Sequence, residues 1–145
     1  MFYPELEAQQ RAQYIELRLS KEMGLFQKSF VMVKPQNLRL IPEIGSFIEK
    51  SGLEIVGGKS LNVSKKQVEE IYKVHQGQAF YSSLVTCTVG EVFLFEVVGN
   101  DAVTVVREEV ISKVRQRFGI NPLQDVVHAP DSLDAYQKET RIFSL

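Results

Sequence analysis

The sequence contains a single cysteine, Cys87, and no tryptophan. One cysteine cannot form a disulfide within the chain, and no pair of Cys or His residues has the spacing of a structural metal site. A chain of 145 residues buries enough apolar surface to fold without either device. We interpret Cys87 as a small core residue and expect a reducing, intracellular setting.

Long apolar runs and an excess of charge of one sign are also missing. No run approaches the ~20 residues that span a bilayer, and the start, "MFYPELEAQQRAQYIELRLSKEMG", lacks the basic end and apolar block of a secretory signal. Seventeen basic residues are scattered among eighteen acidic ones, for a net charge of −1, so no broad field would attract nucleic acid or anionic lipid. These absences predict a cytoplasmic protein that binds neither nucleic acid nor membrane.

Hydrophobic periodicity divides the chain into helices and strands of one domain. A segment rich in Glu, Gln, Ala and Leu at 5–23 is typical of a helix. The sequence "SKKQ" at 64–67 is a capping box that opens another helix, to about residue 74, and the apolar run at 91–99 is typical of a central buried strand. The other expected strands are 29–34, 53–63 with a bulge at Gly57–Gly58, and 140–145; the other expected helices are 41–51, 79–86, 101–117 and 132–139, the last capped by Asp131.

Leaving the first helix aside, the expected order is β, α, β, helical insert, β, α, β, with "DVVHAP" at 125–130 as a connection. This order predicts an α+β fold of the ferredoxin-like type, βαββαβ. Its four-stranded antiparallel sheet carries two helices on one face. The helical insert lies between the second and third strands, and the N-terminal helix is an addition.

The tripeptide Gly58-Lys59-Ser60 matches the end of a phosphate-binding P-loop. The spacing fails, because the first glycine of that motif should stand at position 53, which is Leu53. The context fails as well, because the tripeptide falls inside an expected strand instead of between a strand and a helix. We therefore interpret it as part of a bulged strand.

The informative polar residues stand at the edges of the expected elements. Lysine and arginine around a histidine suit phosphoryl transfer, which mainly requires positioning and positive charge near the phosphate oxygens. A neutral histidine can itself take the phosphoryl group, and a carboxylate can hold the ring in the required tautomer. The residues concerned are Lys34, Arg107, Arg115, Arg117, His128 and Glu139.

Four segments together resemble the nucleoside diphosphate kinase family. They are "FVMVKP", "GLEIVGGKSLNVSKKQVEEIYKVHQGQAFYSSLV", "EVFLFEVVGNDAVTVVR" and "DVVHAPDSLDAYQKETRIF". The resemblance covers residues 28–143, and the family's fold is the ferredoxin-like one expected above. It implies a kinase domain at 28–145 preceded by a helical extension at 1–27.

The resemblance also implies roles near the reacting phosphate. His128 would be the nucleophile that becomes phosphohistidine, and Glu139 would orient it. Lys34 and Tyr72 would lie beside the phosphates and the reacting ring. The implied reaction is ping-pong transfer of the γ-phosphate from a nucleoside triphosphate such as ATP to a nucleoside diphosphate, with Mg²⁺ bound to the nucleotide and no metal held by the protein.

The rest of the nucleotide would be bound by other residues. Phe80 would stack on the base with Leu84 beside it, and an aromatic face accepts any base. Arg107 and Arg115 would bind phosphate oxygens, and Asp125 would stand at the position that contacts sugar and phosphate. The family further implies a homo-oligomer. His75, in the polar turn "HQGQ", is interpreted as exposed and receives no role.

The sequence departs from the family pattern in three places. Only residues 108–114 separate Arg107 from Arg115, where the family carries a long loop with a phosphate-binding threonine, so an uninterrupted helix makes Arg117 a rival of Arg115. Asp125 replaces an asparagine, and its charge would repel a nucleotide. Pro130 replaces a serine. These departures favour, as an alternative, a nucleotide-binding or oligomer-forming module with impaired catalysis; a ferredoxin-like domain that binds RNA is a weaker one.

Overall fold

The computed structural model describes residues 26–119 and 126–145. The expected helix at 5–23, residues 1–25 of the expected extension at 1–27, and Asp125 lie outside these ranges. The described elements are β1 (Phe26–Val33), η1 (Pro35–Leu40), α2 (Ile41–Lys50), β2 (Glu54–Val63), α3 (Lys65–Ile71), η2 (Lys73–His75), α4 (Tyr81–Thr88), β3 (Gly90–Asn100), α5 (Ala102–Val105), η3 (Val106–Ile111), α6 (Ser112–Phe118), β4 (Val127–His128) and α7 (Leu133–Ile142).

The four strands form one antiparallel sheet in the order β2-β3-β1-β4. β3 lies between β2 and β1, which confirms the expectation of a central strand at 91–99. A register shift between Ile55 and Gly57 in β2 confirms an irregularity next to the expected glycine pair. A Cβ at Gly58 would lie 2.6 Å from Cζ of Phe93, so any other residue at this position would require the Phe93 ring to move.

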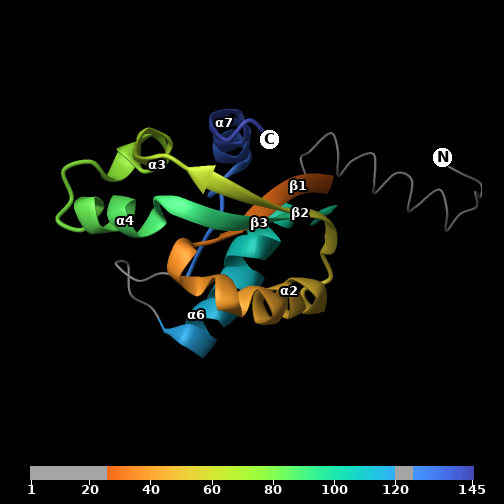
Figure 1. Cartoon of the computed structure of the whole chain (residues 1–145). Helices are drawn as coiled ribbons and strands as arrows, with labels where there is room; N and C mark the ends of the chain where they lie inside the picture. The colour runs from red at the N-terminus through yellow and green to blue at the C-terminus, as the bar shows by residue number, and fades with distance from the viewer. Residues whose placement is uncertain (1–25, 120–125) are drawn as a thin grey trace, which may run out of the picture.

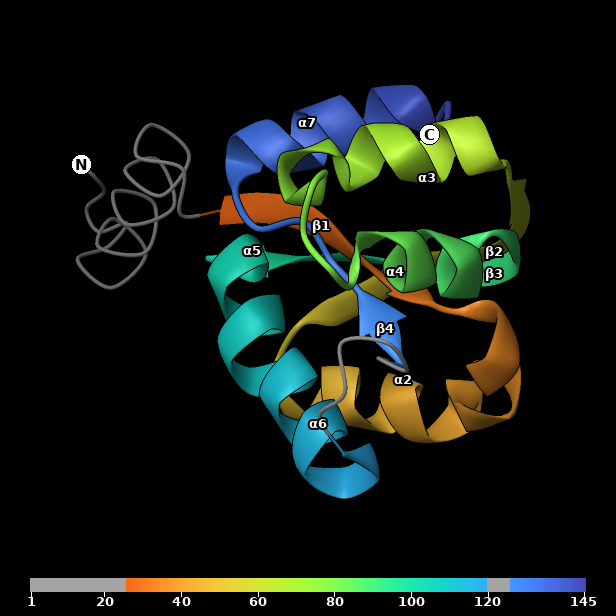
Figure 2. The ribbon, with the colours of Figure 1, turned by 90° about the vertical axis from the view of Figure 1, so that its left-hand side faces the viewer.

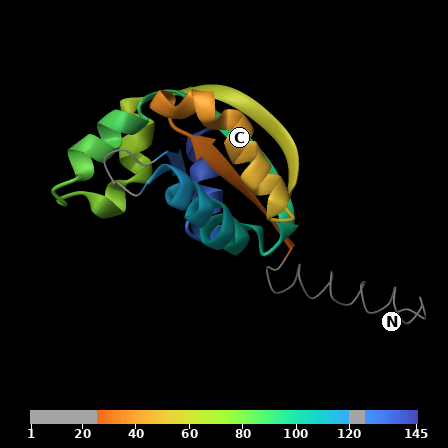
Figure 3. The same cartoon turned by 90° about the horizontal axis from the view of Figure 1, so that it is seen from below.

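Helices cover both faces of the sheet: the two helices expected on one face lie there, and the other face is covered by the helical insert and the last helix, which the sequence did not predict. α2 and the long helix formed by α5, η3 and α6 cover one face, and α3 and α7 lie on the other (Figures 1 and 3). Alternate residues of β1 divide between the faces: Val31 and Val33 belong to the first core, and Phe30 and Met32 to the second. The second core exists because the helical insert and the last helix bring their apolar residues to this face.

In the C-terminal part, the helix expected at 132–139 is present as α7, but the predicted connection and the predicted last strand were wrong. Val127 and His128, assigned to a connection, form β4 and pair with Val33 and Met32 of β1. The segment 140–145, expected to be the last strand, instead continues α7 to Ile142. Phe143 and the partly buried Ile142 pack into the second core. β4 pairs with only the last two residues of β1, after which the chain leaves this edge of the sheet and enters α7.

Side-chain caps fix the residues at which α3 and α7 begin. Ser64 and Gln67 form the expected capping box at the start of α3. Ser132, not Asp131, caps α7 by accepting from the backbone N–H of Ala135. Gln67 Nε2 also donates to the carbonyl oxygen of Ile142 at 3.0 Å, which ties α3 to the end of α7. These two helices lie side by side in Figure 2.

Replacing Gln67 with alanine tests this tie. The change removes the reciprocal capping bond and the bond to α7, so we expect Gln67→Ala to lower the free energy of unfolding by about 1–2 kcal/mol. Urea denaturation measures the loss. Lys66→Ala, at an exposed position of the same helix, is the control and should change stability by less than about 0.5 kcal/mol. Equal effects of the two substitutions would contradict the tie.

Candidate active site

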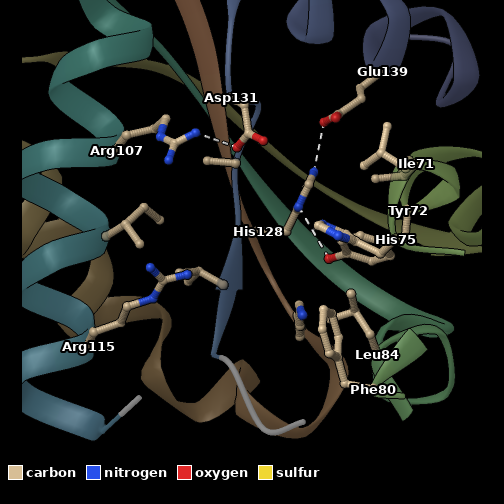
Figure 4. A pocket seen from close by; sticks show the side chains of 15 residues that line it. Ile71, Tyr72, His75, Phe80, Leu84, Arg107, Arg115, His128, Asp131 and Glu139 are labelled. Carbon is tan, nitrogen blue, oxygen red and sulfur yellow. Dashed lines mark hydrogen bonds and ion pairs between the residues drawn. The ribbon is translucent and has the colours of Figure 1, made fainter. Parts of the chain in front are cut away.

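A cavity of about 350 Å³ opens between three groups of elements (Figure 4). One wall comes from α3, η2 and α4, the opposite wall from the long helix α5–η3–α6, and β4 runs between them. Residues far apart in sequence therefore meet here: His128, Glu139, Lys34, Tyr72, Phe80, Leu84, Arg107 and Arg115 all line the cavity. The structure brings together every site residue expected from the sequence except Asp125, which lies outside the described ranges.

The imidazole of His128 is held at both ring nitrogens. Nε2 lies 2.8 Å from Oε1 of Glu139, and Nδ1 lies 3.2 Å from the hydroxyl of Tyr72. Glu139 is 6% exposed although it carries a carboxylate. The ring of Tyr72 meets the imidazole edge-on at 5.3 Å, and Phe30 lies at 6.2 Å. These contacts leave the ring one orientation, with its Nδ1 edge toward Tyr72 and the cavity.

The buried carboxylate decides which nitrogen of His128 is nucleophilic. A carboxylate can only accept, so Glu139 requires a proton on Nε2. In the neutral ring, Nδ1 then has the free lone pair, and the Tyr72 hydroxyl can donate to it. When Nδ1 forms a new bond the ring becomes cationic, and the Glu139 carboxylate stabilises that charge at short range. The site is therefore arranged for attack by Nδ1 of His128.

Lys34 supplies a buried cation to the cavity. It follows β1 directly, and its backbone N–H donates to the carbonyl of Val126 at 3.0 Å, which fixes the lysine beside β4. The residue is 1% exposed, and its Nζ lies 5.5 Å from the centre of the Tyr72 ring and 4.0 Å from Sγ of Cys87. Cys87 is half-buried at this contact, so its interpretation as a plain core residue was incomplete.

Two arginines from one helix face the cavity from the opposite wall (Figure 4). Positions 107 and 115 are about 80° apart around a regular α-helix, at 3.6 residues per turn. The turn Val106–Ile111 is a π-helix, which takes more residues per turn. The extra width brings Arg115 back toward the face that carries Arg107. The helix is uninterrupted, as expected, but its π turn was not foreseen.

Arg115 and Arg117 lie on different sides of the helix and make different contacts. Arg115 lines the cavity. Arg117 instead pairs with Glu43 at 3.5 Å and lies over the ring of Phe118 at 5.3 Å. Arg107 has a partner inside the site, because its Nη1 lies 2.6 Å from Oδ1 of Asp131. Asp131, expected to be a helix cap, is thus part of the cavity wall.

The α4 side of the cavity has an aromatic and aliphatic surface. Phe80 and Leu84 line it, and His75 stands next to Phe80 with ring centres 5.5 Å apart. His75, which was expected to be exposed, is half-buried and lines the cavity, which the sequence analysis missed. His75 follows Tyr72 by three residues, and residues at this spacing share a helix face, so the sequence could have predicted that both line the same site. A planar ring fits such a surface through stacking.

The site thus combines a nucleophilic imidazole, cations on two sides and a surface for a flat ring. That combination defines a phosphotransferase that works through histidine on phosphates attached to an aromatic base. The described residues contain no group of three or more His, Cys, Asp or Glu side chains that could hold a metal ion. Nor does any helix in the described ranges have the length and apolar character needed to cross a membrane.

Comparison with known proteins agrees with the geometry. The family model for nucleoside diphosphate kinase matches residues 27–144. The nucleoside diphosphate kinase of Sulfurisphaera tokodaii is 33% identical over 129 residues, which cover 81% of this chain and 88% of the relative. That of Staphylococcus epidermidis is 34% identical over 129 residues, covering 81% and 87%. The enzyme of Halobacterium salinarum, solved in complex with CDP, superposes with a TM-score of 0.70 at 29% identity and covers 81% of this chain and 87% of that one.

The chain belongs to the nucleoside diphosphate kinase family. The expected α+β ferredoxin-like fold is confirmed, and so is the expectation of a nucleotide-binding phosphotransferase. The roles of individual residues stay predictions, which the following substitutions test.

Arg115→Gln tests the direction of the two neighbouring arginines. If Arg115 binds phosphate oxygens, its loss removes charge-assisted hydrogen bonds and weakens ADP binding about ten- to hundredfold. Isothermal titration calorimetry measures the affinity. Arg117→Gln is the matched control, because it removes the same group from a side chain that pairs with Glu43, and it should leave affinity within about twofold. A larger effect at position 117 would reverse the assignment.

Glu139→Gln tests the support of the imidazole. The amide keeps the shape of the side chain but lacks the negative charge that stabilises a cationic ring, so phosphoryl transfer should slow about ten- to hundredfold. Rapid-quench measurement of the first half-reaction gives the rate. Asp134→Asn, at an exposed position of the same helix, should leave that rate unchanged. Wild-type rates in Glu139→Gln would exclude the carboxylate from the chemistry.

Proposed function

We propose that this protein transfers the γ-phosphate of a nucleoside triphosphate to a nucleoside diphosphate through a phosphohistidine at Nδ1 of His128. One observation carries the proposal. The nitrogen Nε2 is engaged by the buried carboxylate of Glu139 at 2.8 Å, while Nδ1 faces a cavity lined by a lysine and two arginines.

The proposed reaction has two half-steps with the same geometry. The Nδ1 lone pair forms a bond to the γ-phosphorus, and the bond from that phosphorus to the β–γ bridging oxygen breaks, which releases the nucleoside diphosphate. A terminal β-phosphate oxygen of a second diphosphate then attacks the phosphohistidine, and the P–N bond breaks. Throughout, Glu139 keeps the proton on Nε2 and offsets the charge of the phosphorylated ring.

The cations have separate positions around the transferred group. Lys34 lies on the side of Tyr72, and Arg107 and Arg115 lie across the cavity on the long helix. Placed on both sides of His128, they would offset charge on the phosphate oxygens in the transition state. The Tyr72 hydroxyl, 3.2 Å from Nδ1, would hold the ring edge in place before attack.

The base would lie on the α4 side of the cavity. Phe80 offers a face for stacking, Leu84 flanks it, and His75 extends the surface toward solvent. Stacking distinguishes bases only weakly. We therefore propose a broad range of nucleoside di- and triphosphates as substrates, with ATP among the donors.

Mg²⁺ would accompany the nucleotide in this proposal. The described part of the cavity offers no cluster of carboxylates for a protein-held ion, and Mg²⁺ commonly binds through substrate phosphates with few protein ligands. When bound there it would neutralise part of the phosphate charge. The residues of the chain would still position the γ-phosphate against His128.

Further parts of the proposal rest on the family and on composition. Asp125 is proposed to stand near sugar and phosphate, where its charge would lower affinity. We propose a kinase domain at 28–145 with an extension at 1–27, assembly into a homo-oligomer, and a cytoplasmic location. Each stays a prediction.

Incubation with γ-labelled ATP and Mg²⁺ tests the central proposal. The wild-type protein should take up acid-labile, alkali-stable label and lose it on addition of a nucleoside diphosphate. His128→Ala should take up none, while His75→Ala, which removes the other histidine, should still become labelled. A protein that binds ADP but never becomes labelled would instead be the binding module with impaired catalysis.

A further inference from the structure

The single cysteine of the chain contacts the buried lysine of the cavity. Cys87 lies on α4, and its Sγ stands 4.0 Å from Nζ of Lys34. The same sulfur lies 3.3 Å from the carbonyl oxygen of Leu84, one helical turn earlier. It thus lies between a backbone acceptor and an ammonium group.

The direction of both hydrogen bonds follows from the groups involved. A thiol has one proton, and the carbonyl of Leu84 can only accept it. An ammonium group has donors alone, so Lys34 must donate to the sulfur. The hydroxyl of Thr88, 3.8 Å from the sulfur, donates its proton to the same carbonyl at 2.8 Å, so its oxygen is a second acceptor for the thiol proton. With either acceptor, the lone pairs of the sulfur remain available to the ammonium of Lys34. Sulfur is a weak acceptor, but the donor is charged and 1% exposed.

We propose that Cys87 is a positioning residue for Lys34 in the phosphotransfer reaction. The inference rests on the function proposed above and adds a residue to it. A lysine side chain has four rotatable bonds and loses substantial conformational entropy when it is held in one place. Cys87 on one side and the Tyr72 ring on another confine its ammonium to the cavity.

The contact also links two parts of the nucleotide site. Leu84, the acceptor of the thiol proton, is itself a lining residue on the α4 side of the cavity, where the base is proposed to bind. α4 therefore carries one contact for the base and one for the lysine that faces the phosphates. A shift of α4 would move both.

Substitutions at position 87 separate hydrogen bonding from packing. Serine can donate to Leu84 and accept from Lys34, whereas valine fills similar space without an acceptor. We expect Cys87→Ser to keep kcat/KM within about twofold, and Cys87→Val and Cys87→Ala to lower it about two- to tenfold. A role in packing alone predicts the opposite order, with valine the better replacement.

Thr86→Ala, exposed on the same helix, is the control, and thermal denaturation checks that each variant is folded.

A double-mutant cycle with Lys34 decides whether Cys87 acts through the lysine. ADP affinity is measured by calorimetry for the wild type, Cys87→Ala, Lys34→Met and the double variant. If the inference is correct, Cys87→Ala weakens binding about two- to tenfold in the wild type and has no further effect once Lys34 is gone. Equal losses in both backgrounds would overturn it, as would the order expected for packing. The cycle measures ADP affinity and does not depend on phosphoryl transfer. A wild-type protein that binds ADP but takes up no label would therefore refute the proposed function, while the coupling between Cys87 and Lys34 could still be measured.

Discussion

The hydrogen bond between His128 and Glu139 is the constraint on which the rest of the site depends. A carboxylate that is 6% exposed is stable only when a partner compensates for its lost hydration. The partner is the imidazole of His128 on β4, so the fold must place β4 and α7 within hydrogen-bonding distance of each other. Once they do, the proton of His128 is placed on Nε2 and the reactive edge faces the cavity. The tie from Gln67 to Ile142 holds α3, and with it Tyr72, against the same helix.

The long helix has a different role, which is to place two cations on one wall of the cavity. A regular helix would place Arg107 and Arg115 about 80° apart around its axis. The π turn between Val106 and Ile111 brings them to one wall while the apolar residues Val110 and Val114 stay buried. An irregular backbone at this place is consistent with the frequent occurrence of π turns at functional sites.

Local patterns in the sequence predicted what local physics decides. The capping box at Ser64, the central strand at 91–99 and the helix at 101–117 follow from neighbouring residues, and the structure confirms them. The errors arose where tertiary contacts decide. β4 has two residues, too few for an alternating pattern, and the segment from Thr140 has strand-like composition but packs as a helix. The family resemblance assembled the candidate site, whereas the positions of His75, Cys87 and Asp131 in it needed the three-dimensional structure.

The ion pair between Arg107 and Asp131 has a consequence for the cost of binding. In the protein without ligand, the guanidinium of Arg107 is already directed along the cavity wall, because the carboxylate of Asp131 lies 2.6 Å away. Because the two side chains are 47% and 77% exposed, the pair restricts the conformations of Arg107 only in part before a ligand arrives. An incoming phosphate exchanges one anionic partner of the arginine for another. Such an exchange favours rapid turnover over tight retention, which suits a site that must release one nucleotide before it receives the next.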